Sequence, residues 1–142
     1  MQLEHLLLDV NGTLTNRGQL MYGIEERVDR LNEILDIRLV SADTFGTLDT
    51  IAARLQVGAV RAASGEDKLR TLDTLGRHRC AVIGNGANDV LVLSAAALSL
   101  VVLGPEGASP AALRCADVVC ASAAEALDLL LEPQALSATL RP

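Results

Sequence analysis

Residues 6–15 of the chain read Leu-Leu-Leu-Asp-Val-Asn-Gly-Thr-Leu-Thr, an apolar run that ends abruptly in polar residues and a glycine. A short apolar run followed by such a turn is typical of a buried central strand in a parallel sheet. We therefore expect Asp9 at the carboxyl end of the strand, where open α/β sheets bind their ligands. A carboxylate there can attack phosphorus and carry a phosphoryl group, while N–H groups of the turn face the phosphate oxygens.

The rest of the chain alternates between strand-like and helix-like segments. Apolar runs predict strands at residues 5–9, 37–41, 58–61, 80–84, 98–103 and 117–120. Helical periodicity occurs between and after them, at residues 24–35, 48–55, 67–75, 90–97, 110–116 and 123–131, and a short closing helix is expected in 133–142. This alternation implies right-handed crossovers and a parallel sheet. The predicted fold is α/β, a three-layer doubly wound parallel sheet in a single domain over residues 1–142.

Residues 13–22 interrupt the alternation. They contain Asn16-Arg17-Gly18, a turn signal between two short runs. Two interpretations remain open, a short β-hairpin that follows the first strand and projects from the ligand-binding end, or a plain loop.

Composition excludes several classes of partner. The chain has 142 residues, a net charge of −6 and only one Phe and one Tyr. This acidic balance argues against nucleic acid and anionic membranes as partners. The sequence shows neither a signal peptide nor an apolar stretch long enough to span a membrane, so the cytoplasm is the expected location. The three cysteines, an odd number in apolar surroundings, are predicted to be buried and free.

Lys68 stands out because it is the only lysine among the 12 basic residues. An ammonium group on a flexible stem acts as a point charge for phosphate, and arginine does not replace it well in a tight site. The alternative is a solvated lysine in the first turn of a helix.

Four polar clusters follow predicted strand ends or begin the helix beside them: residues 9–13, residues 41–44, Lys68, and residues 84–89. Their order is an acid, a hydroxyl, a lysine and an acidic loop. In this order the clusters resemble the haloacid dehalogenase (HAD) superfamily, whose first motif is Asp-x-Asp-Gly-Thr. The resemblance covers essentially the whole chain. It is closest to the soluble P-type-ATPase-like members, because the fourth cluster contains Gly-Asn-Gly-Ala-Asn-Asp.

The resemblance implies a Mg²⁺-dependent phosphatase or phosphotransferase that acts through an aspartyl phosphate. It makes Asp9, Asn11 and Lys68 the catalytic positions. The residues that it implies for substrate binding are Gly12, Thr13, Ser41, Ala42 and Lys68. The residues that it implies for Mg²⁺ are Asp9, Asn11 through its backbone carbonyl, Asn85, and Asp89 directly or through water.

Two positions depart from the family pattern. Typical members have an aspartate at the position of Asn11 that protonates the leaving group, and such general acid–base help is worth roughly 10²–10⁴-fold. Typical members also have a metal-binding carboxylate at the position of Asn85. Slow turnover is therefore expected. The alternatives are a weak or inactive module that binds phosphate or a phosphorylated partner, and an unrelated doubly wound domain such as a receiver.

The spacing leaves no room for a cap domain. Only 31 residues lie between Asp9 and Ser41, and 26 lie between Ser41 and Lys68. The core elements use both segments. We therefore expect a site that accepts a phosphorylated small molecule or protein. It is either open or covered by the hairpin and a neighbouring subunit of a homo-oligomer.

Overall fold

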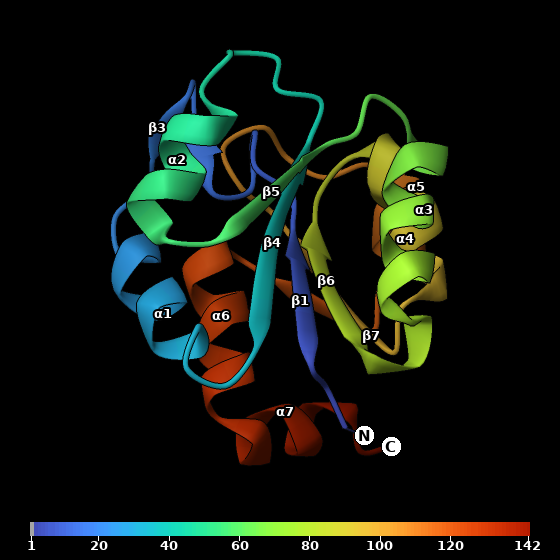
Figure 1. The fold of residues 1–142 in the computed structure, drawn as a ribbon. Coiled ribbons are helices and arrows are strands. Elements are labelled where there is room, and N and C mark those ends of the chain that lie inside the picture. The colour runs from blue at the N-terminus through green and yellow to red at the C-terminus, as the bar shows by residue number, and fades with distance from the viewer. Residues whose placement is uncertain (1) are drawn as a thin grey trace.

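A six-stranded parallel sheet with helices on both faces dominates the structure (Figure 1), a computed structural model that describes residues 2–142. The strand order is β5-β4-β1-β6-β7-β8. The strands of this sheet are β1 His5–Leu8, β4 Asp36–Ser41, β5 Gly58–Arg61, β6 Cys80–Gly84, β7 Leu98–Val102 and β8 Val118–Cys120. All neighbouring strands pair in parallel. The predicted α/β doubly wound fold is confirmed.

The α-helices within residues 2–142 are α1 Ile24–Leu31, α2 Leu48–Leu55, α3 Gly65–Leu75, α4 Val90–Ala95, α5 Pro110–Cys115, α6 Ala123–Leu131 and α7 Pro133–Leu140. Two short 3₁₀ helices span Arg77–Arg79 and Ala87–Asp89. Helices α1, α2 and α6 pack on one face, and α3, α4 and α5 pack on the other (Figure 1). Helix α7 packs against α6. None of the helices within residues 2–142 combines the length and apolar character needed to cross a membrane.

Strand β1 is apolar throughout its interior because both of its faces are covered. Leu6 and Leu8 contribute to the core beneath α1, α2 and α6, whereas Leu7 points into the core beneath α3, α4 and α5. Alternate side chains of a strand point to opposite faces, so a strand between two helical layers needs apolar residues at every position.

The hairpin interpretation of residues 13–22 is confirmed. Strands β2 Thr15–Asn16 and β3 Gln19–Leu20 pair antiparallel around a two-residue loop. Both loop residues have positive φ, 52° for Arg17 and 83° for Gly18. This is the geometry of a type I′ turn, which matches the twist of a hairpin.

Helix α1 is shorter than the periodicity of residues 24–35 predicts, and it ends at Leu31. Its last turn tightens, with the N–H groups of both Ile34 and Leu35 directed at the Leu31 carbonyl. The N–H of Asp36 already donates to the Glu4 carbonyl at 2.9 Å, and β4 starts there. The chain must leave the helix early to reach this register, and Ile34 is left 64% exposed.

The sheet order fixes where the polar clusters meet. The chain runs from β1 outward to β4 and β5, and then crosses to β6 on the other side of β1. The carboxyl ends of β4, β1 and β6 therefore lie side by side at a topological switch point, the usual ligand site of such sheets. Within residues 2–142, the segment between β1 and β4 holds the hairpin and α1, and the segment between β4 and β5 holds α2. Neither contains a cap.

The three cysteines agree with the prediction, because Cys80 and Cys120 are buried, Cys115 is partly buried, and all three are free thiols.

We expect Leu8→Ala to lower the free energy of unfolding by about 2–5 kcal/mol, since Leu8 is fully buried and the substitution leaves a cavity in the central strand. Urea denaturation measures this loss. The control is Leu140→Ala at the end of α7, where the side chain is 39% exposed. Equal losses in the two variants would contradict the placement of β1 at the centre of the core.

Candidate active site

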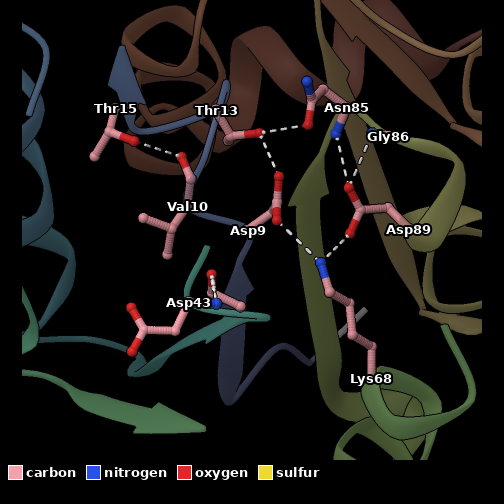
Figure 2. Close-up of polar contacts among 10 residues, drawn as sticks. Asp9, Val10, Thr13, Thr15, Asp43, Lys68, Asn85, Gly86 and Asp89 are labelled. Atoms are coloured by element: carbon pink, nitrogen blue, oxygen red, sulfur yellow. Dashed lines mark hydrogen bonds and ion pairs between the residues drawn. The ribbon is translucent and has the colours of Figure 1, made fainter. Parts of the chain in front are cut away.

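Lys68 joins two of the polar clusters inside the protein. Its side chain is 2% exposed, and Nζ lies 2.9 Å from Asp9 Oδ1 and 2.7 Å from Asp89 Oδ1 (Figure 2). It comes from the first turn of α3, which Ser64 caps by accepting a hydrogen bond from the Asp67 N–H. The alternative of a solvated lysine is therefore wrong.

Asp9, Lys68 and Asp89 form a buried charged triad, and the interactions among them set its protonation. Burial, together with repulsion from Asp89, outweighs the attraction of Lys68 and raises the pKa of Asp9 from 3.8 to about 6. For Lys68, burial lowers the pKa, but the two carboxylates raise it further, so that its pKa lies above the ordinary value. Lys68 therefore stays charged, and with both carboxylates ionised the triad carries one net negative charge.

The turn after β1 holds the Asp9 carboxylate in a fixed orientation. The Asp9 N–H donates to the Ile83 carbonyl at 3.0 Å, which ties the turn to β6. The Thr13 hydroxyl lies 2.9 Å from Asp9 Oδ2 and 3.2 Å from Asn85 Oδ1 (Figure 2). Thr13 and Lys68 thus contact one oxygen of Asp9 each, and together they prevent the carboxylate from rotating.

Gly12 permits the close approach of the neighbouring loops. Its φ is +76°, and a Cβ at this position would lie 2.9 Å from Asn85 Nδ2 and 2.9 Å from two carbons of Glu106. Both the left-handed backbone and the lack of space require glycine here.

Asp89 acts as an internal support. It is 1% exposed, and its Oδ2 accepts hydrogen bonds from the N–H groups of Asn85 and Gly86, both at 3.0 Å. With Oδ1 directed at Lys68, both of its oxygens are engaged. Asp89 therefore orients Lys68 and shapes the loop after β6.

Ser41 ends β4 with its side chain almost buried. The Asp43 N–H donates to Ser41 Oγ at 2.9 Å, which leaves the hydroxyl hydrogen available for a ligand. Asp43 has φ +61°, and its carboxylate accepts a hydrogen bond from the Leu48 N–H at 3.0 Å. This loop geometry holds Ser41 in place.

A pocket of about 310 Å³ opens at the meeting point of these clusters. The predicted residues that line it are Asp9, Asn11, Ser41, Ala42 and Asn85. The other predicted residues, Gly12, Thr13, Lys68 and Asp89, are buried and do not line the pocket. Thr13, Lys68 and Asp89 support Asp9 and Asn85 from within.

Three further lining residues, Thr44, Gly86 and Asn88, belong to the predicted clusters 41–44 and 84–89. The lining residues that the sequence did not predict are Glu106, Gly107 and Ser109. Glu106 and Gly107 belong to the loop after β7. The signal was the stretch Gly104-Pro105-Glu106-Gly107 directly after a predicted strand, which is a fifth polar turn at the same edge of the sheet.

The donor set of the pocket suits a hard cation. Asp9, Asn85 and Glu106 offer oxygen atoms, the ligands that Mg²⁺ prefers, and the net negative charge of the triad favours a cation. Within residues 2–142, no three His, Cys, Asp or Glu side chains lie close enough together to hold a metal by themselves. Amide, carbonyl and water ligands would complete the shell, which is the usual arrangement for Mg²⁺.

Comparison with known proteins identifies archaeal relatives. No protein-family model matches the chain. The uncharacterized protein MJ0073 of Methanocaldococcus jannaschii is 40% identical over 78 residues, which are 52% of this chain and 84% of that protein. MJ0072 of the same organism is 44% identical over 39 residues, 28% of this chain and 89% of that protein. The chain belongs to the same family as MJ0073.

Solved structures identify the fold. The cobalt-bound deoxy-D-mannose-octulosonate 8-phosphate phosphatase of Haemophilus influenzae has a TM-score of 0.78 at 16% identity, over 99% of this chain and 94% of that one. The 3-deoxy-D-manno-octulosonate 8-phosphate phosphatase of Moraxella catarrhalis, solved with magnesium, phosphate and KDO, has a TM-score of 0.72 at 17% identity, over 98% and 94%. A Streptomyces avermitilis protein assigned to the HAD hydrolases has a TM-score of 0.69 at 16% identity, over 83% and 75%. The chain has the HAD fold.

The raised pKa of Asp9 predicts a pH-dependent difference between wild type and Asp9→Asn. Because this pKa rises from 3.8 to about 6 on folding, the folded state binds more protons between these values, and wild-type stability falls as pH rises through them. The amide in the Asp9→Asn variant does not titrate. As pH rises from 4 to 7, the free energy of unfolding of Asp9→Asn should therefore increase relative to that of wild type by about 3 kcal/mol.

Urea denaturation at several pH values measures this difference. Asp29→Asn, at an exposed position on α1, is the control and should follow the wild-type pH dependence. Parallel curves for wild type and Asp9→Asn would show that burial does not perturb Asp9.

Proposed function

We propose that the chain is a HAD-fold phosphatase or phosphotransferase whose nucleophile is Asp9. The observation that carries the proposal is the placement of Asp9 at the carboxyl end of β1, with a buried lysine 2.9 Å from its carboxylate and a polar pocket beside it. Fold alone does not determine function, whereas this group of side chains has the chemistry that phosphoryl transfer needs.

In the proposed reaction, a carboxylate oxygen of Asp9 attacks the phosphorus of a phosphomonoester in line with the leaving oxygen. The new bond joins phosphorus to Asp9, and the bond from phosphorus to the leaving oxygen breaks. The Ser41 hydroxyl binds a phosphoryl oxygen, and Lys68 offsets the charge of the phosphoryl group. The turn after β1 offers fewer N–H groups than the sequence predicts, because those of Gly12 and Thr13 already donate to the carbonyls of Thr15 and Val10. Water then attacks phosphorus, which releases phosphate and restores the carboxylate.

The reaction lacks the usual general acid for the leaving oxygen, because Asn11 lines the pocket but cannot exchange a proton. The leaving oxygen must then take its proton from water, so we infer slow turnover.

Mg²⁺ fits the oxygen donors of the pocket, and when bound it would neutralise charge on the transferring phosphoryl group. The proposed ligands are Asp9, the backbone carbonyl of Asn11, and Asn85. Asp89 would contribute through water, because both of its oxygens already have partners within the protein.

The open pocket favours phosphorylated small molecules or proteins as substrates. The acidic net charge of −6 disfavours nucleic acid and anionic membranes. We further infer a cytoplasmic protein, similar to the soluble P-type-ATPase-like members of the superfamily. Alternatively, the hairpin and a second subunit of a homo-oligomer cover the site.

Asn11 favours a second candidate function, a regulatory module that binds phosphate or a phosphorylated partner without turnover. The triad would then serve binding alone. The two functions differ in whether Asp9 becomes phosphorylated and whether product is released.

Beryllofluoride with Mg²⁺ tests the nucleophile, since this reagent mimics an aspartyl phosphate. Binding to the native state alone raises stability, by about 2.7 kcal/mol at a hundredfold excess over the dissociation constant. We expect a higher melting temperature for wild type in a thermal denaturation assay and none of this increase for Lys68→Ala.

Arg70→Ala is the matched control, because Arg70 lies on the same helix with an exposed side chain. It should respond like wild type. An unchanged wild-type melting temperature at saturating reagent would mean that Asp9 is not a working nucleophile.

Asn11→Asp separates the two candidate functions. The substitution supplies a group that can transfer protons at nearly constant side-chain size. Hydrolysis of an aryl phosphate with Mg²⁺ should rise about tenfold or more, given the range of general acid–base catalysis. Adding Asp9→Asn to this variant should abolish the gain. An unchanged rate in a folded Asn11→Asp protein would favour the binding module.

A further inference from the structure

We propose that Glu106 is a ligand of the divalent cation in this pocket, and that it supplies the carboxylate that is missing at Asn85. The inference rests on the proposed function, and it names a residue that none of the four sequence clusters contains.

The loop that carries Glu106 is fastened to the site on two sides. Asn85 Nδ2 donates to the Gly107 carbonyl at 3.0 Å, and the Ser109 N–H donates to the Asn85 carbonyl at 2.8 Å. On the other side, Gly104 lies against the turn after β1, since a Cβ on Gly104 would be 2.5 Å from the Gly12 carbonyl oxygen. The loop therefore holds a defined position against the turn after β1 and the loop after β6.

The Glu106 side chain lies over Gly12 at the mouth of the pocket. A Cβ on Gly12 would be 2.9 Å from Glu106 Cδ and equally 2.9 Å from Asn85 Nδ2. The carboxyl group of Glu106 and the Asn85 amide thus border the same space beside Gly12, and Glu106 lines the same pocket as Asp9 and Asn11.

The side-chain amide of Asn85 makes a hydrogen bond that a carboxylate at this position could not make. Its amide N–H group donates to the Gly107 carbonyl, while its Oδ1 lies 3.2 Å from the Thr13 hydroxyl. An aspartate has no hydrogen to donate and would set an oxygen against the carbonyl oxygen. We infer that the amide fastens the loop of residues 103–109, and that the loop brings a negative charge back to the pocket at Glu106.

The charge count supports this assignment. Asp89 engages both of its oxygens with Lys68 and two N–H groups, so it has no free oxygen facing a cation. Among the family-motif residues, only Asp9 then offers a carboxylate to the pocket. Glu106 adds a second one, and the number of charged ligands is a main determinant of affinity for hard cations.

The Glu106 side chain is able to turn toward an ion in the pocket. Its exposure and its three side-chain torsions permit this movement.

Calorimetric titration with Mg²⁺ alone tests the assignment. Glu106→Gln keeps the shape and removes the charge, and we expect its dissociation constant to be about tenfold or more above that of wild type. Glu106→Asp keeps the charge but withdraws it by one methylene, so it should recover only part of the affinity. Glu33→Gln, the same change at an exposed site, is the control and should bind like wild type.

Two results would overturn the role of Glu106: wild-type affinity in Glu106→Gln, or full wild-type affinity in Glu106→Asp, which would show that charge matters without coordination. If Asp9→Asn loses Mg²⁺ binding while Glu106→Gln retains it, the assignment of Glu106 fails and the proposed function stands. If wild type does not bind Mg²⁺ at all, both fail.

Discussion

The ammonium of Lys68 between Asp9 and Asp89 is the interaction on which the rest of the site depends. A lysine that is 2% exposed must be paired, since removal of one partner from a buried ion pair costs about 3–5 kcal/mol. The pairing requires the end of β1, the loop after β6 and the first turn of α3 to converge on one point. The parallel sheet with its switch point between β4 and β6 provides that convergence.

The two aspartates of the triad have different roles because their surroundings differ. Asp89 is enclosed, and two N–H groups and Lys68 occupy its oxygens. Asp9 is held by Lys68 and Thr13 but borders the pocket, so it can meet a ligand. Asn11 and Asn85 both line the pocket, and Asn85 in addition fastens a neighbouring loop.

The HAD fold is retained here at 16–17% identity to the solved phosphatases. At such low sequence identity, the property that these proteins share is the arrangement of strands. This arrangement brings certain strand ends together whatever side chains they carry. The chemistry depends on the side chains at those ends. In this chain they give a carboxylate at the end of β1, a buried lysine and hydroxyl groups, with amides in two places where carboxylates are typical of the superfamily.

The sequence by itself determined the fold and most of the pocket. The apolar run in β1 marked a strand buried on both faces, and parallel pairing then required residues 9–13, 41–44 and 84–89 to meet, because the carboxyl ends of parallel strands share an edge.

Only the tertiary structure decided the hairpin at residues 13–22, the early end of α1, the burial of Lys68 and the place of Glu106. Local patterns report the periodicity of single elements, whereas these features depend on contacts between distant segments. The bond from Asn85 to Gly107 spans 22 residues, and that from Lys68 to Asp9 spans 59. Such contacts form only once the packed loops bring their partners together.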